Sequence, residues 1–165
     1  MQGKLILVEG LCGTGKSTLA GRLYRHIAAQ GIPARFYDEG AEGHPASLNG
    51  HAFFRQKEFA GLLGRFPDHA SELRSRAVTH GPYVLVPYRQ FRNIGALYGE
   101  LKSRELCWTD AAPAAFWEFT DVMRRHWGRF AEAVAVSGDV YVLEAVFFQH
   151  QIHDLLKHYR SEERR

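Results

Sequence analysis

A stretch near the start of the chain has the residue types and the spacing that bind phosphate. Residues 10–17 read Gly-Leu-Cys-Gly-Thr-Gly-Lys-Ser and fit the pattern G-x-x-x-x-G-K-[ST] at every fixed position. The glycines permit positive φ and let backbone N–H groups approach a polyphosphate. The lysine is placed to bridge β- and γ-phosphate oxygens, and the serine hydroxyl is placed to ligate Mg²⁺. The residues expected to contact the nucleotide, ATP or GTP, are Gly10, Cys12, Gly13, Thr14, Gly15, Lys16, Ser17 and Thr18.

The surroundings of this motif favour a nucleotide-binding loop. Residues 5–8 form an apolar run that predicts a short buried strand, and residues 17–30 have apolar positions at helical spacing. That helix would direct its positive dipole end at the phosphates. The alternative is a glycine-rich turn that only joins a strand to a helix. We prefer the nucleotide loop because strand, loop and helix follow one another in the order that the motif requires.

Phosphoryl transfer also needs carboxylates, and the chain has them where predicted strands end. Glu144 follows the apolar residues 140–143 and is the candidate magnesium ligand, unless it only caps the next segment. Asp38 and Glu39 follow a predicted strand at residues 34–37 and could accept the proton of an acceptor hydroxyl, or form a charged turn. Ligands of open α/β sheets bind at the carboxyl ends of the strands. With the loop lysine, these three acids are the candidate catalytic residues.

Three further residues are candidates for binding the acceptor substrate. Glu9 stands just before the glycines, where it could hold the loop or reach a substrate hydroxyl. Arg89 and Arg92 follow an extended segment and could clamp an acidic substrate or the transferred phosphoryl group. The pair Arg124 and Arg125, on a predicted helix, is a weaker candidate of the same kind. For each of these arginines the alternative is an ordinary surface position.

The composition fits one globular domain in a reducing compartment. The chain has 165 residues, of which 45% are apolar, so it can bury a real core. No apolar run is long enough to span a membrane. Cys12 and Cys107 are too few for a disulfide framework, so a cytoplasmic location is expected. His150 and His153 lack a second ligand pair, which argues against a zinc site.

The charge does not indicate nucleic acid as a partner. The formal net charge is +3, but arginine and lysine are dispersed along predicted helices and form no basic block except at the end of the chain. The expected partners are therefore a nucleotide and a small-molecule acceptor.

The order of the predicted elements indicates an α/β fold with three layers, in which helices cover a short parallel sheet. Residues 1–165 are expected to form a single domain, with a helical insertion at about residues 47–137 between the second and third core strands. Residues 83–88 resemble an edge strand or another extended segment, because Pro87 cannot donate to a sheet and would not fit a central strand. Helices are expected at residues 53–66, 68–79, 93–106, 114–136 and 152–160.

Together these features resemble the nucleoside and nucleotide kinase branch of the phosphate-loop NTPases, thymidylate-kinase-like proteins in particular. The likeness rests on residues 8–18, on the acids after the second strand and on the strand that ends in Glu144. It extends to small bacterial phosphate-loop proteins with a similar glycine loop. These also have an acid-Gly-x-x-x-His-Pro turn like the one within residues 38–45 and a Val-Pro-Tyr segment like residues 86–88. The resemblance implies a kinase fold.

The sequence departs from this family in two respects. Nucleotide kinases usually have an arginine-bearing lid and two further core strands, whereas this sequence stops soon after Glu144. The strand end continues as Ala145 and Val146, without the arginine that thymidylate kinases have there. In the usual strand order the loop strand is central, so missing neighbours would expose its edge. We therefore expect residues 83–88 to cover that edge, or the chain to form a homodimer through it.

The sequence thus predicts an ATP-binding, Mg²⁺-dependent phosphotransferase that acts on a nucleoside, a nucleotide or a similar hydroxyl or phosphate acceptor. One alternative is an NTP hydrolase or nucleotide-sensing switch, which would turn over nucleotide without an acceptor. Another is a truncated, non-catalytic nucleotide-binding protein that pairs with a partner.

Overall fold

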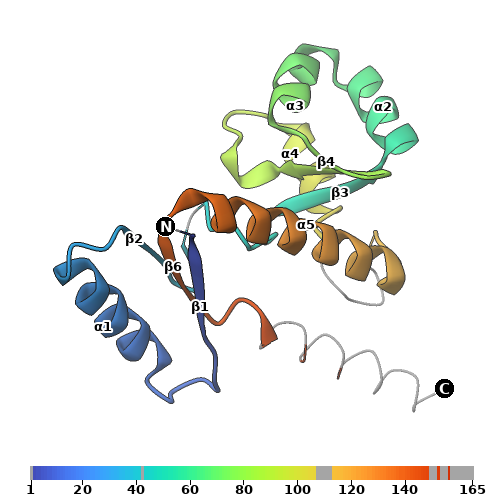
Figure 1. Ribbon diagram of the computed structural model, residues 1–165. Helices are drawn as coiled ribbons and strands as arrows, with labels where there is room; N and C mark the ends of the chain where they lie inside the picture. Colours follow the sequence, from blue (N-terminus) through green and yellow to red (C-terminus); the bar gives the residue numbers. More distant parts are fainter. Residues whose placement is uncertain (1, 42, 107–112, 149–151, 153–155, 157–165) are drawn as a thin grey trace. The chain divides into compact units, whose positions relative to one another are not determined.

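The computed structural model divides the chain into two compact units (Figure 1). Unit 1 comprises Met1–Ser47 and Trp127–Arg165, and unit 2 comprises Leu48–His126. Each unit has its own sheet and its own apolar core. Among the described residues, no helix is both long and apolar enough to cross a membrane. The residues that the structure describes are 2–41, 43–106, 113–148, 152 and 156.

Unit 1 is built on a three-stranded parallel sheet with the order β1-β6-β2. Strands β1 (Lys4–Val8) and β2 (Ala34–Tyr37) both pair with β6 (Val140–Glu144), which lies between them. The register places Val8 directly beside Glu144. Because parallel strands bring their carboxyl ends to one edge of a sheet, the residues that follow β1, β2 and β6 gather at that edge.

Helices cover both faces of this sheet. On one face, Ala20 and other apolar residues of α1 (Lys16–Ala29) pack with Ile6 and Val8 of β1. On the other face, the later part of α5 (Phe116–Ser137) packs with Leu5 and Leu7 of the same strand. Successive residues of a strand point to opposite faces, so a continuous apolar run supplies both layers. The α/β class with a short parallel sheet is confirmed.

Unit 2 combines a three-stranded antiparallel sheet with short helices. Strand β5 (Tyr83–Pro87) lies between β3 (His51–Arg55) and β4 (Val78–His80). The turn between β4 and β5 begins at Gly81, whose φ of 63° is a conformation that glycine adopts readily. The helical segments are α2 (Gln56–Arg65), η1 (Pro67–His69), α3 (Ala70–Arg76), η2 (Tyr88–Gln90) and α4 (Ala96–Lys102).

Helix α5 contributes to both cores. The boundary between the two units falls within it, after His126. Before this boundary, Phe119 and Val122 are buried in the core of unit 2. After it, Phe130 and Val134 are buried in the core of unit 1. The apolar positions at helical spacing therefore predict the helix correctly, within two residues at its start.

The structure corrects the helical interpretation of residues 47–137, because unit 2 also contains a sheet. The helix predicted from residue 53 begins only at Gln56, since Phe53 and Phe54 are fully buried in β3. Aromatic residues favour strands, and those two rings pack on opposite sides of the sheet, in different apolar clusters. The helix predicted over residues 68–79 ends at Arg76 and is followed by β4. The helix predicted over residues 93–106 is the shorter α4.

The prediction of an edge strand at residues 83–88 was wrong, because β5 is the central strand of its sheet. Pro87 is the last residue of β5 and lies opposite His51 in the terminal pair of the β3–β5 ladder. At this position the missing N–H of proline does not interrupt the hydrogen bonds between the other residue pairs of the two strands. The expectation that this segment covers the edge of β1 was also wrong, since it pairs with β3 and β4. Among the described residues, β1 pairs only with β6. A homodimer through β1 stays a prediction.

Candidate functional site

The glycine loop (residues 10–17) connects β1 to α1 and is exposed up to Gly15. Gly13 and Gly15 have φ angles of 80° and 85°, a region in which an L side chain is strained. The Thr14 hydroxyl donates to the carbonyl of Leu11 at 2.8 Å and closes the turn. The thiol of Cys12 is free and exposed in the same turn. The sequence therefore forms an open loop whose backbone is accessible.

Helix α1 begins directly after this loop without a local cap. Its N-cap residue, Gly15, has no side chain that could accept from the first N–H groups, and its first turn contains no acid. Thr18 lies exposed in that first turn. The first N–H groups of a helix need an acceptor, and the helix dipole favours a negative one. An anion at this end of α1 would supply both.

Three charged side chains from distant parts of unit 1 meet at the start of α1. The Nζ atom of Lys16 lies 3.9 Å from a carboxylate oxygen of Glu144 and 3.9 Å from one of Glu39. Lys16 and Glu144 are buried, whereas the Glu39 side chain is 41% exposed. The Ser17 hydroxyl donates to the same Glu144 oxygen at 2.5 Å. The lysine, the serine and two of the sequence-predicted acids thus form one site.

The parallel register explains how Glu144 reaches the glycine loop. Glu144 ends β6 beside Val8, and the loop starts two residues after Val8. Ala145 then continues the ladder by donating its N–H to the Val8 carbonyl at 3.0 Å. Ala145 is fully buried and has a φ of 51°, which is rare for a residue other than glycine. Such a strained residue marks a place where surrounding contacts determine the course of the backbone.

Glu9 is turned toward the segment that follows Glu144. Its Oε1 atom accepts the N–H of Val146 at 3.1 Å and the N–H of Phe147 at 2.9 Å. These two hydrogen bonds attach Glu9 to the segment after Glu144, while the interpretations that Glu9 holds the glycine loop or contacts substrate stay predictions.

Asp38 and Glu39 begin the loop after β2, and the structure distinguishes between them. Of these two acids, Glu39 is the one that forms an ion pair with Lys16 among the described residues. Asp38 is exposed, and its carbonyl accepts the N–H of Ala41 in the turn. His44 of the same loop is buried, and its Nδ1 accepts the N–H of Ala46 at 3.1 Å. Desolvation lowers the pKa of His44, although the nearby charge of Asp38 acts in the opposite direction.

The donor set at this site suits Mg²⁺. A hydroxyl oxygen of Ser17 and a carboxylate oxygen of Glu144 converge, and oxygen atoms are the ligands that Mg²⁺ prefers. Two carboxylates against one ammonium group leave an excess of one negative charge, which a divalent cation would offset. No group of three or more His, Cys, Asp and Glu side chains in the described part of the chain forms a purely protein-made metal site. Such a site would therefore need oxygens from a bound phosphate, as is usual for Mg²⁺.

Arg89 and Arg92 belong to unit 2, where they have structural contacts. The guanidinium of Arg89 donates to the Asn49 side chain at 3.1 Å and lies 3.6 Å from Glu105. Arg92 donates to the backbone carbonyls of Arg89 and Phe91. A role of either arginine in binding substrate stays a prediction. Arg124 and Arg125 both pair with Asp121 on α5, as surface residues often do.

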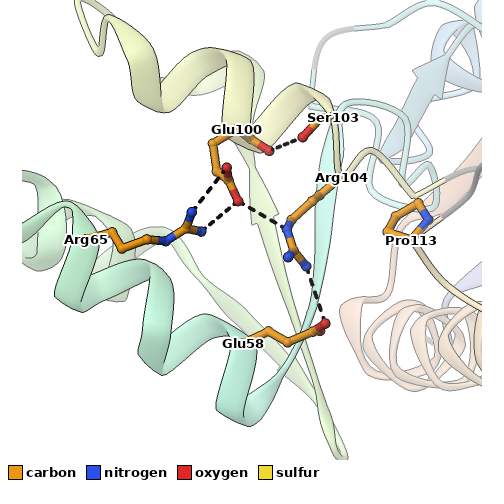
Figure 2. A pocket seen from close by; sticks show the side chains of 6 residues that line it. All are labelled: Glu58, Arg65, Glu100, Ser103, Arg104 and Pro113. Carbon is orange, nitrogen blue, oxygen red and sulfur yellow. Dashed lines mark hydrogen bonds and ion pairs between the residues drawn. The ribbon is translucent and has the colours of Figure 1, made fainter.

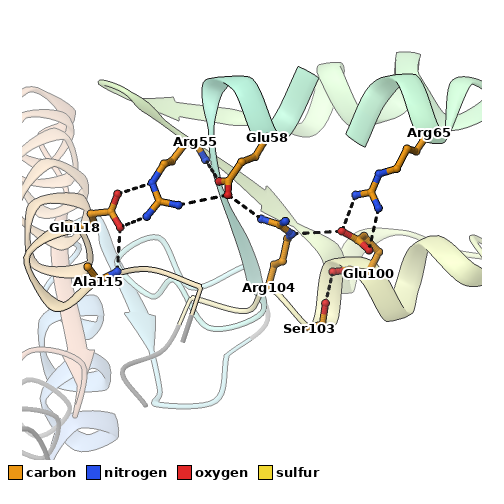
Figure 3. Close-up of polar contacts among 8 residues, drawn as sticks. All are labelled: Arg55, Glu58, Arg65, Glu100, Ser103, Arg104, Ala115 and Glu118. Atoms are coloured by element: carbon orange, nitrogen blue, oxygen red, sulfur yellow. Dashed lines mark hydrogen bonds and ion pairs between the residues drawn. The ribbon is translucent and has the colours of Figure 1, made fainter. Parts of the chain in front are cut away.

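Unit 2 has a depression of about 680 Å³ with a polar lining. Figure 2 shows Glu100 between the guanidinium groups of Arg65 and Arg104. Arg104 also pairs with Glu58 at 3.5 Å, and Figure 3 shows this chain of alternating charges continuing through Arg55 to Glu118. Because each arginine here is neutralised by a glutamate, the lining offers no surplus charge to a ligand. We interpret it as a structural network.

Two residues of unit 1 that lie next to the site, His44 and Ala145, were not among the candidates from the sequence. His44 gave a weak signal, because a histidine close behind two acids at a strand end lies where ligands bind. Ala145 gave no signal, because nothing in an alanine side chain indicates positive φ. His150 and most of the predicted final helix, together with Cys107, lie outside the described residues.

Comparison of the chain with protein-family models, with curated proteins and with solved structures found no significant match.

Proposed function

We propose that unit 1 binds a nucleoside triphosphate, ATP or GTP, together with Mg²⁺ and transfers the γ-phosphoryl group to a small molecule. The observation that carries this proposal is the meeting of Lys16, Ser17 and Glu144 where the parallel strands end. The contiguous motif, the uncapped helix and the magnesium-compatible oxygens all belong to one site. We accordingly propose that unit 1 has the three-layer fold of the phosphate-loop kinases.

Each part of the site has a distinct task in this proposal. The backbone N–H groups of the glycine loop and of the first turn of α1 would hold the phosphates. The ammonium group of Lys16 would neutralise negative charge on the phosphate oxygens as the γ-phosphoryl group is transferred. Ser17 and Glu144 would hold Mg²⁺, which when bound neutralises charge between the β- and γ-phosphates.

Glu39 is the better placed of the two acids for the acceptor. It is partly exposed, so a substrate can reach it, and it lies beside Lys16. Its carboxylate would orient the acceptor hydroxyl and take its proton, while the hydroxyl oxygen bonds to the γ-phosphorus and the bond to the bridging oxygen breaks. Asp38, one residue earlier on the same loop, is the alternative base.

The first test measures nucleotide binding by wild-type protein and by Lys16→Ala. Loss of a charge-assisted contact with phosphate, worth about 1.5–3 kcal/mol, should weaken ATP binding by roughly 10- to 100-fold. Phosphoryl transfer from radiolabelled ATP to a panel of nucleosides, nucleotides and alcohols should fall to background. Lys57→Ala, which removes an exposed lysine of unit 2, is the matched control and should behave as wild type.

The outcomes separate the alternatives. Full phosphoryl transfer by Lys16→Ala would contradict the proposal. Nucleotide hydrolysis at the same rate with every acceptor would favour a hydrolase or a nucleotide-sensing switch. Tight Mg²⁺-dependent binding without turnover of any kind would favour a non-catalytic nucleotide-binding protein that acts with a partner.

A further inference from the structure

The end of β1 holds the turn that follows Glu144 by three consecutive hydrogen bonds. The N–H of Ala145 is accepted by the Val8 carbonyl, and the N–H groups of Val146 and Phe147 are accepted by one oxygen of Glu9. The acceptors of all three hydrogen bonds therefore belong to Val8 and Glu9, the two residues that precede the glycine loop. The turn after β6 is built on the end of β1.

This turn has to be held because its backbone is unfavourable by itself. Ala145 adopts a φ of 51°, which is unfavourable for a residue with a Cβ atom. Without contacts from the rest of unit 1, this segment would relax to another backbone conformation. On the far side of the turn, the ring of Phe147 lies 4.8 Å from that of Trp127 in an edge contact. The carboxylate of Glu9 and the aromatic contact thus fix the two sides of one short segment.

The direction of the Glu144 side chain depends on the same segment. Glu144 immediately precedes Ala145 in the chain. The carboxylate of Glu144 accepts a hydrogen bond from the hydroxyl of Ser17, the last residue of the glycine loop. A rotation of the backbone at Ala145 would move the carboxylate away from Ser17. Because Glu9 holds the N–H groups of Val146 and Phe147, it can act on the Glu144 carboxylate through the backbone of this turn.

We propose that Glu9 is a positioning residue, which holds the turn after Glu144 against the glycine loop so that Glu144 and Ser17 present their oxygens together to Mg²⁺. This inference rests on the proposed function, because it assigns Glu9 a task in the magnesium site of that function. The expectation that Glu9 contacts the acceptor substrate is separate from this inference and stays a prediction. What matters is the reach and the acceptor oxygen of the Glu9 side chain, and its charge is secondary.

Two substitutions separate reach from charge. Glu9→Gln keeps the length of the side chain and one carbonyl oxygen that accepts N–H groups, but it loses the charge. Glu9→Asp keeps the charge but withdraws the oxygens by one methylene. Positioning predicts that Gln preserves the site better than Asp, whereas a direct electrostatic role predicts the reverse order. Glu132→Ala, at an exposed position on α5 in the same unit, is the control.

The measurement is binding of a non-hydrolysable ATP analogue by calorimetry, with Mg²⁺ and with a chelator. For Glu9→Asp and Glu9→Ala, the gain in affinity that Mg²⁺ provides should fall by about 10-fold or more, as when supports of metal ligands are removed. Affinity without Mg²⁺ should stay near that of wild type, because the glycine loop is intact. Glu9→Gln should keep most of the Mg²⁺-dependent gain, and the control should keep all of it.

The possible results are distinguishable from failure of the proposed function. If wild type binds no nucleotide, the proposed function is overturned and this inference with it. If wild type shows Mg²⁺-dependent binding and Glu9→Asp shows the same, only this inference is overturned. Greater damage from Gln than from Asp would likewise overturn it, in favour of a direct role for the charge. If Glu9→Ala does not fold, the comparison between Gln and Asp still decides.

Discussion

Lys16 shows at the scale of one residue why this site is organised for a charged ligand. A buried ammonium group is costly unless carboxylates or phosphates lie nearby, and here Glu144 and Glu39 are both at 3.9 Å. The geometry at 3.9 Å is looser than a direct hydrogen bond, so these ion pairs leave the lysine able to exchange a carboxylate for a phosphate oxygen. His44 is a second buried titratable side chain of unit 1, and burial makes its charged form costly as well.

We predict that His44 makes the stability of unit 1 depend on pH. Desolvation lowers the pKa of His44 in the folded chain, whereas in the unfolded chain it titrates near its ordinary value of about 6.5. Below that pH the unfolded chain gains a proton that the folded chain does not take up. The free energy of unfolding should therefore be fully present above about pH 6.5 and should fall as the pH decreases toward the folded-state pKa.

Urea denaturation of wild type and His44→Asn between pH 8 and pH 5 would check this prediction. Asparagine keeps an acceptor near the position of Nδ1 for the N–H of Ala46 but does not titrate. The variant should lose stability less steeply below about pH 6.5, and the two slopes should coincide above pH 7. Part of the slope should remain, since burial also lowers the pKa of His51 in unit 2. Identical slopes throughout would contradict the assignment.

At the scale of elements, the glycine loop and α1 show that glycine can be favourable in one backbone conformation and unfavourable in another. Gly15 and Gly21 both have open space where a Cβ would be placed. Gly15 has a φ of 85°, whereas Gly21 lies in the interior of α1. The difference between them is therefore conformational and does not arise from steric contact.

We predict opposite changes in stability from alanine at these two positions. Gly15→Ala should lower the free energy of unfolding by about 1–2 kcal/mol, because an L residue is strained in the left-handed region. Gly21→Ala should raise it by about 0.5–1 kcal/mol, because alanine restricts the unfolded chain and favours the helix. Urea denaturation of both variants beside wild type measures the two effects. Equal signs for the two changes would show that the loop is not held in this conformation.

At the scale of the whole molecule, the chain forms two units with separate cores, and α5 takes part in both. At the start of α5, the buried carboxylate of Glu118 accepts the N–H of Ala115 and two N–H groups of Arg55 (Figure 3). This arrangement caps the helix and joins it to β3 inside unit 2. The aspartate one turn later, Asp121, forms its ion pairs with Arg124 and Arg125 of its own helix.

We therefore predict that Glu118→Ala destabilises unit 2 and that Asp121→Ala does not. Loss of the cap and of the buried acceptor should cost about 2 kcal/mol. The exposed pairs of Asp121 should contribute little. Hydrogen exchange followed by mass spectrometry should show faster exchange in β3 and β5 for Glu118→Ala, with β6 of unit 1 less affected. Equal loss of protection in β5 for both variants would contradict the distinction.

The sequence alone determined what depends on neighbouring residues. The glycine loop is a contiguous motif, β2 follows from an extended run, and α1 and α5 follow from apolar residues at helical spacing. The sequence was less informative for unit 2, where buried aromatic residues fit a strand or a helix equally well in short runs. For this reason the sequence predicts the start of a helix where β3 lies, and Pro87 predicts an edge position for the strand that is central in the sheet.

Only the tertiary structure decided which of the candidate acids meet. Ser17 and Glu144 are 127 positions apart, and it is the parallel pairing of β1 with β6 that brings their oxygens together. The tertiary structure also brings Glu39 of the loop after β2 to Lys16, and it directs Glu9 to the turn after Glu144. Strand register and backbone strain are properties of segments distant in the chain. Local residue patterns therefore identified the chemistry, and packing determined its geometry.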